Sequence, residues 1–92
     1  MSEILIVDDS LTVRMDLADA VEAAGFVAVP CATLAEARTA LRTRTIALGI
    51  LDVRLPDGDG VEFLEELRAE PAFAELPIVM LSTEAEVKDR IR

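Results

Sequence analysis

The stretch IALGILDVRLPDGDG, residues 46–60, joins an apolar run to an aspartate and then to a dense turn signal. The run from Ile46 to Leu51 carries no charge, which is typical of a strand buried on both faces of a parallel sheet. Asp52 follows the run directly, and Pro, Gly and Asp residues crowd the turn after it. This order predicts a strand that delivers a carboxylate to the edge of a sheet.

Three other short apolar runs predict the remaining strands, at residues 4–7, 26–29 and 78–81. The second of these is expected to stop near Pro30. Longer segments with helical periodicity separate the runs, and strands that alternate with helices form parallel sheets through right-handed crossovers. The sequence therefore predicts an α/β fold in one domain, built on a doubly wound parallel sheet.

Capping residues mark the helices between these strands. Ser10 is expected to cap the first helix, and Gly25 to end it. The next three helices are expected to begin at capping boxes at residues 33–36, 59–62 and 83–86, and the chain ends inside the last helix. The apolar faces expected along the first three helices are Val13, Leu17, Val21 and Ala24; Leu34, Ala37, Ala40 and Leu41; and Val61, Phe63, Leu64 and Leu67.

Composition excludes several classes of function. The chain has 92 residues, which suits one small domain, and its net charge of −9 argues against nucleic-acid binding. The absence of His excludes His-ligated metal sites. The single Cys31 excludes an internal disulfide, and we expect it to pack as a small apolar residue. The N-terminus lacks a basic region, and no apolar run is long enough to span a bilayer, so we expect a cytoplasmic protein without membrane contact.

Polar side chains follow three of the predicted strands where those strands end. Asp8 and Asp9 follow the first strand, Asp52 the third and Ser82 the fourth. Ligands bind at the carboxyl ends of parallel strands, so these side chains are expected to converge. Each of them taken alone also fits a turn or a helix cap, and the prediction of a site therefore rests on their joint placement.

Clustered carboxylates repel one another unless a shared proton or a cation neutralises them. Oxygen ligands favour a hard cation, and Mg²⁺ is the expected one. A carboxylate on a central strand beside bound Mg²⁺ is suited to attack a phosphoryl group and form an acyl phosphate. The pattern thus predicts Asp52 as a nucleophile in phosphoryl transfer.

The segments ILIVDDS (4–10), LDVRLPDGDG (51–60) and PIVMLSTEA (77–85) together resemble the receiver domain of two-component response regulators. The resemblance covers essentially the whole chain and implies a flavodoxin-like fold with strand order 2-1-3-4. It implies that Asp52 is both a metal ligand and the acceptor of a phosphoryl group from a histidine kinase or phosphotransfer domain. The protein would then be a signalling phosphoacceptor whose only catalysis is its own phosphorylation and dephosphorylation, not an enzyme with an external substrate.

The same resemblance assigns further roles residue by residue. Asp8 and Asp9 resemble the acidic pair of the metal site, Asp9 as a direct ligand and Asp8 through water. The backbone carbonyl of Arg54 matches the remaining protein ligand, and Ser82 matches the hydroxyl that approaches the phosphoryl group. The side chains of Arg54 and Glu84 occupy the positions that tune dephosphorylation. Pairing between them across the path of the attacking water is expected to make the phosphorylated state long-lived.

The chain departs from the family pattern at its C-terminal end. The resemblance implies a fifth strand with a phosphoryl-binding Lys and a fifth helix, and neither is present in residues 1–92. Lys88 lies in the predicted fourth helix and is expected to be a surface charge. We therefore expect an incomplete receiver domain over 1–92 whose fourth strand is an exposed edge. Such an edge predicts a homodimer or swapped dimer through the fourth strand and fourth helix.

The sequence leaves one other function open and disfavours two. A receiver-like dimerisation or scaffold module, not productively phosphorylated, stays open because of the short C-terminal end. A phosphatase of the haloacid dehalogenase type is disfavoured, since Asp52 is followed by Val53 and Arg54 and the second Asp of that class is absent. A flavodoxin-like nucleotide binder is disfavoured because Asp8 and Asp9 would repel phosphate groups.

Overall fold

A computed structural model of the chain describes residues 1–81. The predictions made for Ser82, Glu84, Lys88 and the helix after strand four lie outside the described residues. Within the described part, parallel strands form one sheet in the order β2-β1-β3-β6, which confirms the predicted strand order and fold class. The bounds of these strands are Glu3–Val7 for β1, Val27–Cys31 for β2, Ile46–Asp52 for β3 and Ile78–Leu81 for β6.

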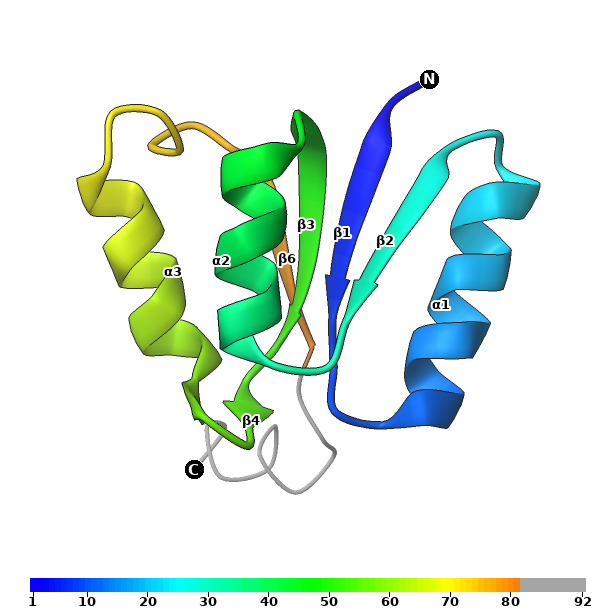
Figure 1. Cartoon of the computed structure of the whole chain (residues 1–92), viewed down its shortest axis with the longest axis horizontal. Coiled ribbons are helices and arrows are strands. Elements are labelled where there is room, and N and C mark those ends of the chain that lie inside the picture. The colour runs from blue at the N-terminus through cyan, green and yellow to red at the C-terminus, as the bar shows by residue number, and fades with distance from the viewer. Residues whose placement is uncertain (82–92) are drawn as a thin grey trace, which may run out of the picture.

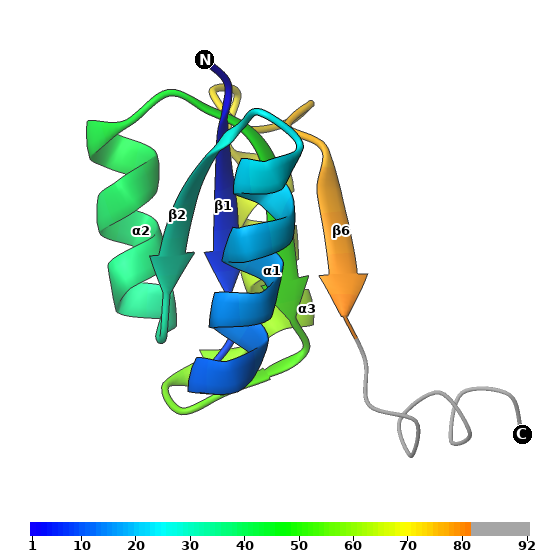
Figure 2. The ribbon, with the colours of Figure 1, turned by 90° about the vertical axis from the view of Figure 1, so that its right-hand side faces the viewer.

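Helices cover both faces of this sheet, with α1 on one face and α2 and α3 together on the other (Figure 1 and Figure 2). Their bounds are Leu11–Ala23 for α1, Leu34–Thr43 for α2 and Gly60–Ala69 for α3. Among residues 1–81, no helix combines the length and the apolar character needed to cross a membrane.

Side-chain oxygens cap the three described helices at the predicted residues. The Ser10 hydroxyl accepts a hydrogen bond from the Val13 N–H at 3.3 Å, and the Thr33 hydroxyl accepts one from the Glu36 N–H at 3.1 Å. An Asp59 carboxylate oxygen accepts from the Val61 N–H at 2.6 Å. These bonds satisfy backbone donors that have no partner inside the helix, so each helix begins where its capping residue stands.

Gly25 ends α1, as predicted. Its φ of 94° lies in the left-handed region, which glycine adopts without the steric cost that a Cβ imposes. The Gly25 N–H donates to the Glu22 carbonyl at 3.0 Å, and the Phe26 N–H donates to the Val21 carbonyl at 3.1 Å. This bonding pattern is the Schellman motif, which satisfies the last carbonyls of the helix.

The second strand was predicted one residue too early at its start and too short at its end. It runs through Pro30 to Cys31, because β2 is an edge strand, where the missing N–H of proline removes no ladder bond. The turn predicted after Asp52 lies in a short antiparallel hairpin, formed by β4 (Arg54–Leu55) and β5 (Gly58–Asp59).

The main core lies between the sheet and the two helices α2 and α3. The predicted stripe of α2 is buried throughout, and Phe63 and Leu67 of α3 are also buried. The prediction was wrong for Val61, which is 38% exposed. Gly60, Phe63 and Leu67 share the buried face of α3, and Val61 lies about 100° around the helix from Gly60.

Within residues 1–81, the opposite face of the sheet is less well covered. Helix α1 has no buried residue, although Leu17 and Val21 from its predicted stripe are half-buried. These side chains form, with Ile4, Leu48 and Ile50 of the sheet, one apolar groove of about 300 Å³. The predicted stripe was therefore right for Leu17 and Val21, which are half-buried, and wrong for Val13 and Ala24, which are exposed.

Cys31 lies in the main core and is 4% exposed, which confirms its predicted packing role. Burial raises the pKa of its thiol to about 11, and the charge of Glu36 contributes to the rise. The thiol is therefore protonated at neutral pH and is a weak nucleophile.

Candidate functional site

Strand register brings the predicted carboxylates together. Val7, the last residue of β1, pairs with Leu51 of β3, so the residues that follow, Asp8 and Asp52, are neighbours at the same sheet edge. Carboxylate oxygens of Asp8, Asp9 and Asp52 all lie within 4.8 Å of one another. The structure thus confirms the predicted convergence for the three carboxylates, whereas Ser82 lies outside the described residues.

Asp8 is the buried member of this acidic cluster, at 6% exposure. One of its carboxylate oxygens accepts a hydrogen bond from the Ser10 N–H at 2.8 Å. Its backbone carbonyl accepts one from the Arg14 guanidinium at 2.8 Å. The start of α1 therefore fixes the Asp8 segment at the sheet edge. Asp9 is exposed and contributes a second carboxylate to the cluster.

The half-buried Asp52 is held in an environment that disfavours its charge. Burial raises the pKa of its carboxyl above the ordinary 3.8, and the charges of Asp8 and, less strongly, Asp9 raise it further. The backbone N–H groups of Val53 and Arg54 favour the charged carboxylate and oppose this rise in pKa. A cation at the cluster would therefore stabilise the ionised form of Asp52.

Gly60 closes the loop behind Asp52, and sequence reasoning did not single it out. Its N–H donates to the Val53 carbonyl at 2.7 Å. A Cβ at Gly60 would lie 2.0 Å from the Asp52 carbonyl oxygen, a distance at which backbone has to move. The Gly directly after the cap of α3 was visible in the sequence, but only the fold shows which backbone it approaches.

Asp57 was also missed as a candidate. Its two carboxylate oxygens accept hydrogen bonds from the Leu34 N–H at 2.9 Å and the Ala35 N–H at 3.0 Å. The hydrogen bond from Leu34, more than any other interaction, holds the pKa of the Asp57 carboxyl below its ordinary value. No local sequence pattern predicts this contact, because the turn and the helix are distant in sequence.

The donor set of the acidic cluster fits a hard divalent cation. It consists of carboxylate oxygens alone, and carboxylates with water suit Mg²⁺ in proteins. Asp9 and Asp52 are accessible enough for a cation to reach them, whereas Asp8 is enclosed. The proposed role of the Arg54 carbonyl stays a prediction. Ser82 and Glu84 lie outside the described residues, so their roles stay predictions as well.

Comparisons with known proteins agree with this geometry. The family model of the response regulator receiver domain matches residues 4–92. The KDP operon transcriptional regulatory protein KdpE of Escherichia coli K12 is 37% identical over 91 residues, which are 99% of this chain and 39% of KdpE. The phosphate regulon transcriptional regulatory protein PhoB of the same strain is 33% identical over 89 residues, 97% of this chain and 39% of PhoB.

A solved structure shows the same fold. The chemotaxis response regulator CheY4 of Vibrio cholerae superposes with a TM-score of 0.88 at 28% identity, covering 99% of this chain and 76% of that one. The chain spans 39% of the length of the two curated relatives.

Proposed function

The chain belongs to the response regulator receiver domain family of two-component systems, and from this premise we propose that it accepts a phosphoryl group on Asp52 with the help of Mg²⁺. The observation that carries the proposal is the cluster of carboxylate oxygens from Asp8, Asp9 and Asp52 within 4.8 Å of one another. Three carboxylates held this closely repel one another, which destabilises the fold. Their placement is therefore best explained by a site that binds a cation and a phosphoryl group.

The proposed donor is a phosphohistidine of a histidine kinase or phosphotransfer domain. An Asp52 carboxylate oxygen would attack phosphorus; the new O–P bond forms as the P–N bond breaks, and the donor nitrogen keeps the electron pair. Bound Mg²⁺ would supply neutralisation of the charge that develops on the phosphoryl oxygens. The Val53 and Arg54 N–H groups favour the ionised Asp52 carboxylate, which is the form that attacks.

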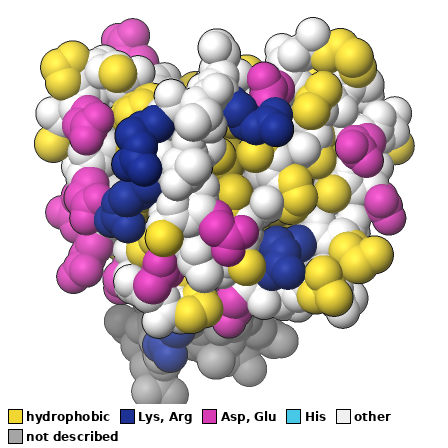
Figure 3. Space-filling view, viewed as in Figure 1, with side chains coloured by type: hydrophobic (Ala, Val, Ile, Leu, Met, Phe, Trp, Pro, Cys, Tyr) yellow, Lys and Arg dark blue, Asp and Glu magenta, His cyan; other side chains and the backbone are white. Residues whose placement is uncertain are grey.

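The surface beside the cluster suits a protein donor. Leu11 and Met15 of α1 are 61% and 56% exposed, and they line with Arg14 a pocket of about 330 Å³ that reaches Pro30 and Ala32. Exposed apolar side chains gathered in this way mark contact surfaces in soluble proteins. Hydrophobic side chains are visible over this side of the molecule in Figure 3. We propose that the donor docks here, in the cytoplasm, and that the chain acts on no external substrate.

Phosphorylation by a small donor tests the proposal. The chain is incubated with acetyl phosphate, with Mg²⁺ or with EDTA, and its intact mass is recorded. We expect the gain of one phosphoryl group only with Mg²⁺, its loss on treatment with hydroxylamine, which cleaves acyl phosphates, and its location in the peptide that contains Asp52. A folded protein that gains no mass, or gains it equally in EDTA, would contradict the proposal.

A second candidate function is that of a dimerisation or scaffold module. It is favoured by β6, which is the edge of the sheet formed by residues 1–81 and where Val79 is 50% exposed, and by the apolar groove between α1 and the sheet. Both features could be covered by a second copy of the chain. Sedimentation analysis at micromolar concentration should then show a dimer, and Val79→Lys should return it to a monomer. A monomer at all accessible concentrations would leave phosphorylation as the only supported function.

A further inference from the structure

The β4–β5 hairpin has little buried surface to hold it. Among residues 54–59, only Leu55 is partly buried against the main core, and the others are exposed. Gly58 adds a close approach, because a Cβ there would lie 2.8 Å from the Leu34 side chain. Segments with few buried contacts open readily. Polar contacts are therefore more important for the local stability of this hairpin than they would be for a segment in the core.

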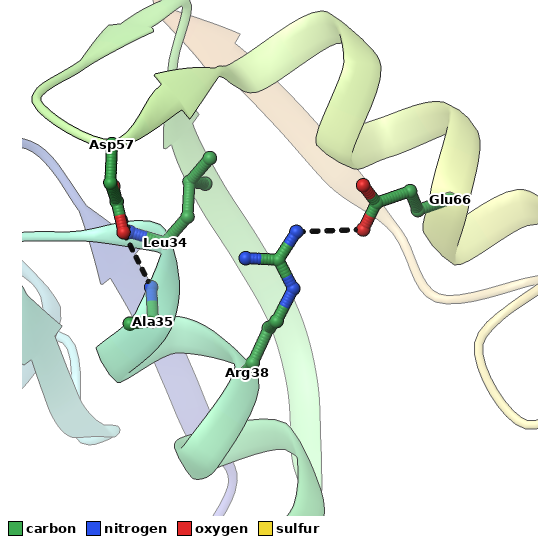
Figure 4. A network of polar contacts seen from close by, with 5 residues as sticks. All are labelled: Leu34, Ala35, Arg38, Asp57 and Glu66. Atoms are coloured by element: carbon green, nitrogen blue, oxygen red, sulfur yellow. Dashed lines mark hydrogen bonds and ion pairs between the residues drawn. The ribbon is translucent and has the colours of Figure 1, made fainter.

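Asp57 supplies such a contact, at the tip of the hairpin. Its carboxylate binds the backbone N–H groups of Leu34 and Ala35 at 2.9 and 3.0 Å, one with each oxygen (Figure 4). Thr33 caps the same helix through its hydroxyl, which accepts from Glu36. The first turn of α2 therefore has two capping side chains, and only Asp57 comes from the hairpin.

Helix α2 is a firm anchor for this contact. Its apolar face is buried in the main core, and Arg38 forms an ion pair with Glu66 of α3 at 2.8 Å (Figure 4). The Arg38 guanidinium also lies 5.0 Å from the centre of the Phe63 ring. In Figure 3, basic side chains over α2 lie beside acidic ones over α3. The anchor is thus tied to the rest of the core independently of Asp57.

The other end of the hairpin contacts the acceptor. Arg54 begins β4, two residues after Asp52, and its backbone N–H favours the charged form of the Asp52 carboxylate. Gly60 follows β5, and its N–H closes the loop on the Val53 carbonyl at 2.7 Å. A hairpin that shifts at its tip would therefore shift the backbone groups that orient Asp52.

We propose that Asp57 is a positioning residue of the acceptor site: by binding the first turn of α2, it fixes the β4–β5 hairpin whose backbone orients Asp52. The inference rests on the proposed function, because the property that Asp57 sets is the readiness of the acidic cluster to bind Mg²⁺ and of Asp52 to be phosphorylated. Asp57 itself touches neither.

Mg²⁺ titration of the full chain by calorimetry tests this role in Asp57→Ala and in a matched control, Thr33→Ala. Both variants lose a cap of α2, but only the first loses the tie to the hairpin. Loss of groups that orient metal ligands weakens metal binding by about tenfold or more, and we expect about tenfold weaker Mg²⁺ binding in Asp57→Ala. Thr33→Ala should bind Mg²⁺ as the wild type does, with a similar fall in melting temperature.

Asp57→Asn provides a rescue, because its amide oxygen keeps one acceptor for the α2 N–H groups. We expect its Mg²⁺ affinity, and the Mg²⁺ concentration for half-maximal phosphorylation by acetyl phosphate, to fall between those of wild type and Asp57→Ala. Equal Mg²⁺ affinity in Asp57→Ala and Thr33→Ala would overturn the inference and leave the proposed function intact. A wild-type chain that binds no Mg²⁺ would overturn both.

Discussion

Asp52→Asn is expected to abolish the Mg²⁺-dependent gain of phosphoryl mass while raising the melting temperature of the metal-free protein. The amide has no charged oxygen to attack phosphorus, so no acyl phosphate forms. The same change removes one of three negative charges that lie within 4.8 Å of one another, and this relieves repulsion that the fold otherwise has to tolerate. Activity and stability are thus expected to move in opposite directions.

The raised pKa of Asp52 makes the gain in melting temperature depend on pH. A carboxyl whose pKa is higher in the folded than in the unfolded state favours folding when protonated. That contribution is complete below the ordinary value of 3.8 and is lost as the pH rises through the folded-state pKa. The Asn variant has no such loss, so its advantage in melting temperature should be absent in acid and should grow as the pH rises to neutrality.

Circular dichroism melts in EDTA across this pH range measure the effect. Asp19→Asn is a suitable control, because it removes the same charge from an exposed position on α1 and should change the melting temperature little. Added Mg²⁺ should stabilise the wild type by mass action and stabilise Asp52→Asn less, which narrows or reverses the difference. A metal-free Asp52→Asn protein less stable than the wild type at neutral pH would show that repulsion in the acidic cluster is not significant.

The fold and the acidic cluster were predictable because the information for both is local. Each strand is a short apolar run, and the residue that ends it is fixed by its position in the chain, as for Asp8 after β1 and Asp52 at the end of β3. Parallel pairing then places these ends together, and the caps at Ser10, Thr33 and Asp59 set the helix starts.

The features that were missed depend on contacts between distant segments. The rotation of α3 about its axis decides whether Val61 or Phe63 faces the core. The apolar periodicity of the sequence does not fix this rotation closely enough to choose between them. The bond from Asp57 to Leu34 joins a turn to a helix, and no pattern in either segment predicts it. The approach of Gly60 to the backbone of Asp52 belongs to the same class.

Gly60→Ala has two opposing effects on the stability of the protein. Gly60 is the first residue of α3, and alanine is preferred in helices by up to about 1 kcal/mol, so propensity alone predicts a more stable protein. The new Cβ, however, would lie 2.0 Å from the Asp52 carbonyl oxygen and 3.2 Å from the Val53 Cα. These atoms belong to the backbone, so no side-chain rotation relieves the clash, and overpacking of this kind costs about 1–3 kcal/mol or more.

We therefore expect Gly60→Ala to lower the free energy of unfolding by about 2 kcal/mol, which is the upper end of this cost less the propensity gain of about 1 kcal/mol. For a domain of this size each kcal/mol corresponds to about 4–8 °C, which predicts a fall in melting temperature of about 8–16 °C. The backbone that moves carries Asp52, so the Mg²⁺ affinity of the protein that stays folded should fall as well. Calorimetric titration below the melting temperature separates this local effect from unfolding.

Gly25→Ala is the control for this substitution, because the cause of its cost is different. No atom lies within 4 Å of the Cβ position at Gly25, and the expected loss of about 1–2 kcal/mol comes only from placing alanine at a φ of 94°. Gly25 follows α1, at the end of that helix remote from Ser10 and Asp8, so this variant should keep the Mg²⁺ affinity of the wild type. If Gly60→Ala were as stable as the wild type and bound Mg²⁺ equally well, the close approach of α3 to the acceptor strand would be wrong. Loss of Mg²⁺ affinity in Gly60→Ala but not in Gly25→Ala would show that the start of α3 sets the position of Asp52.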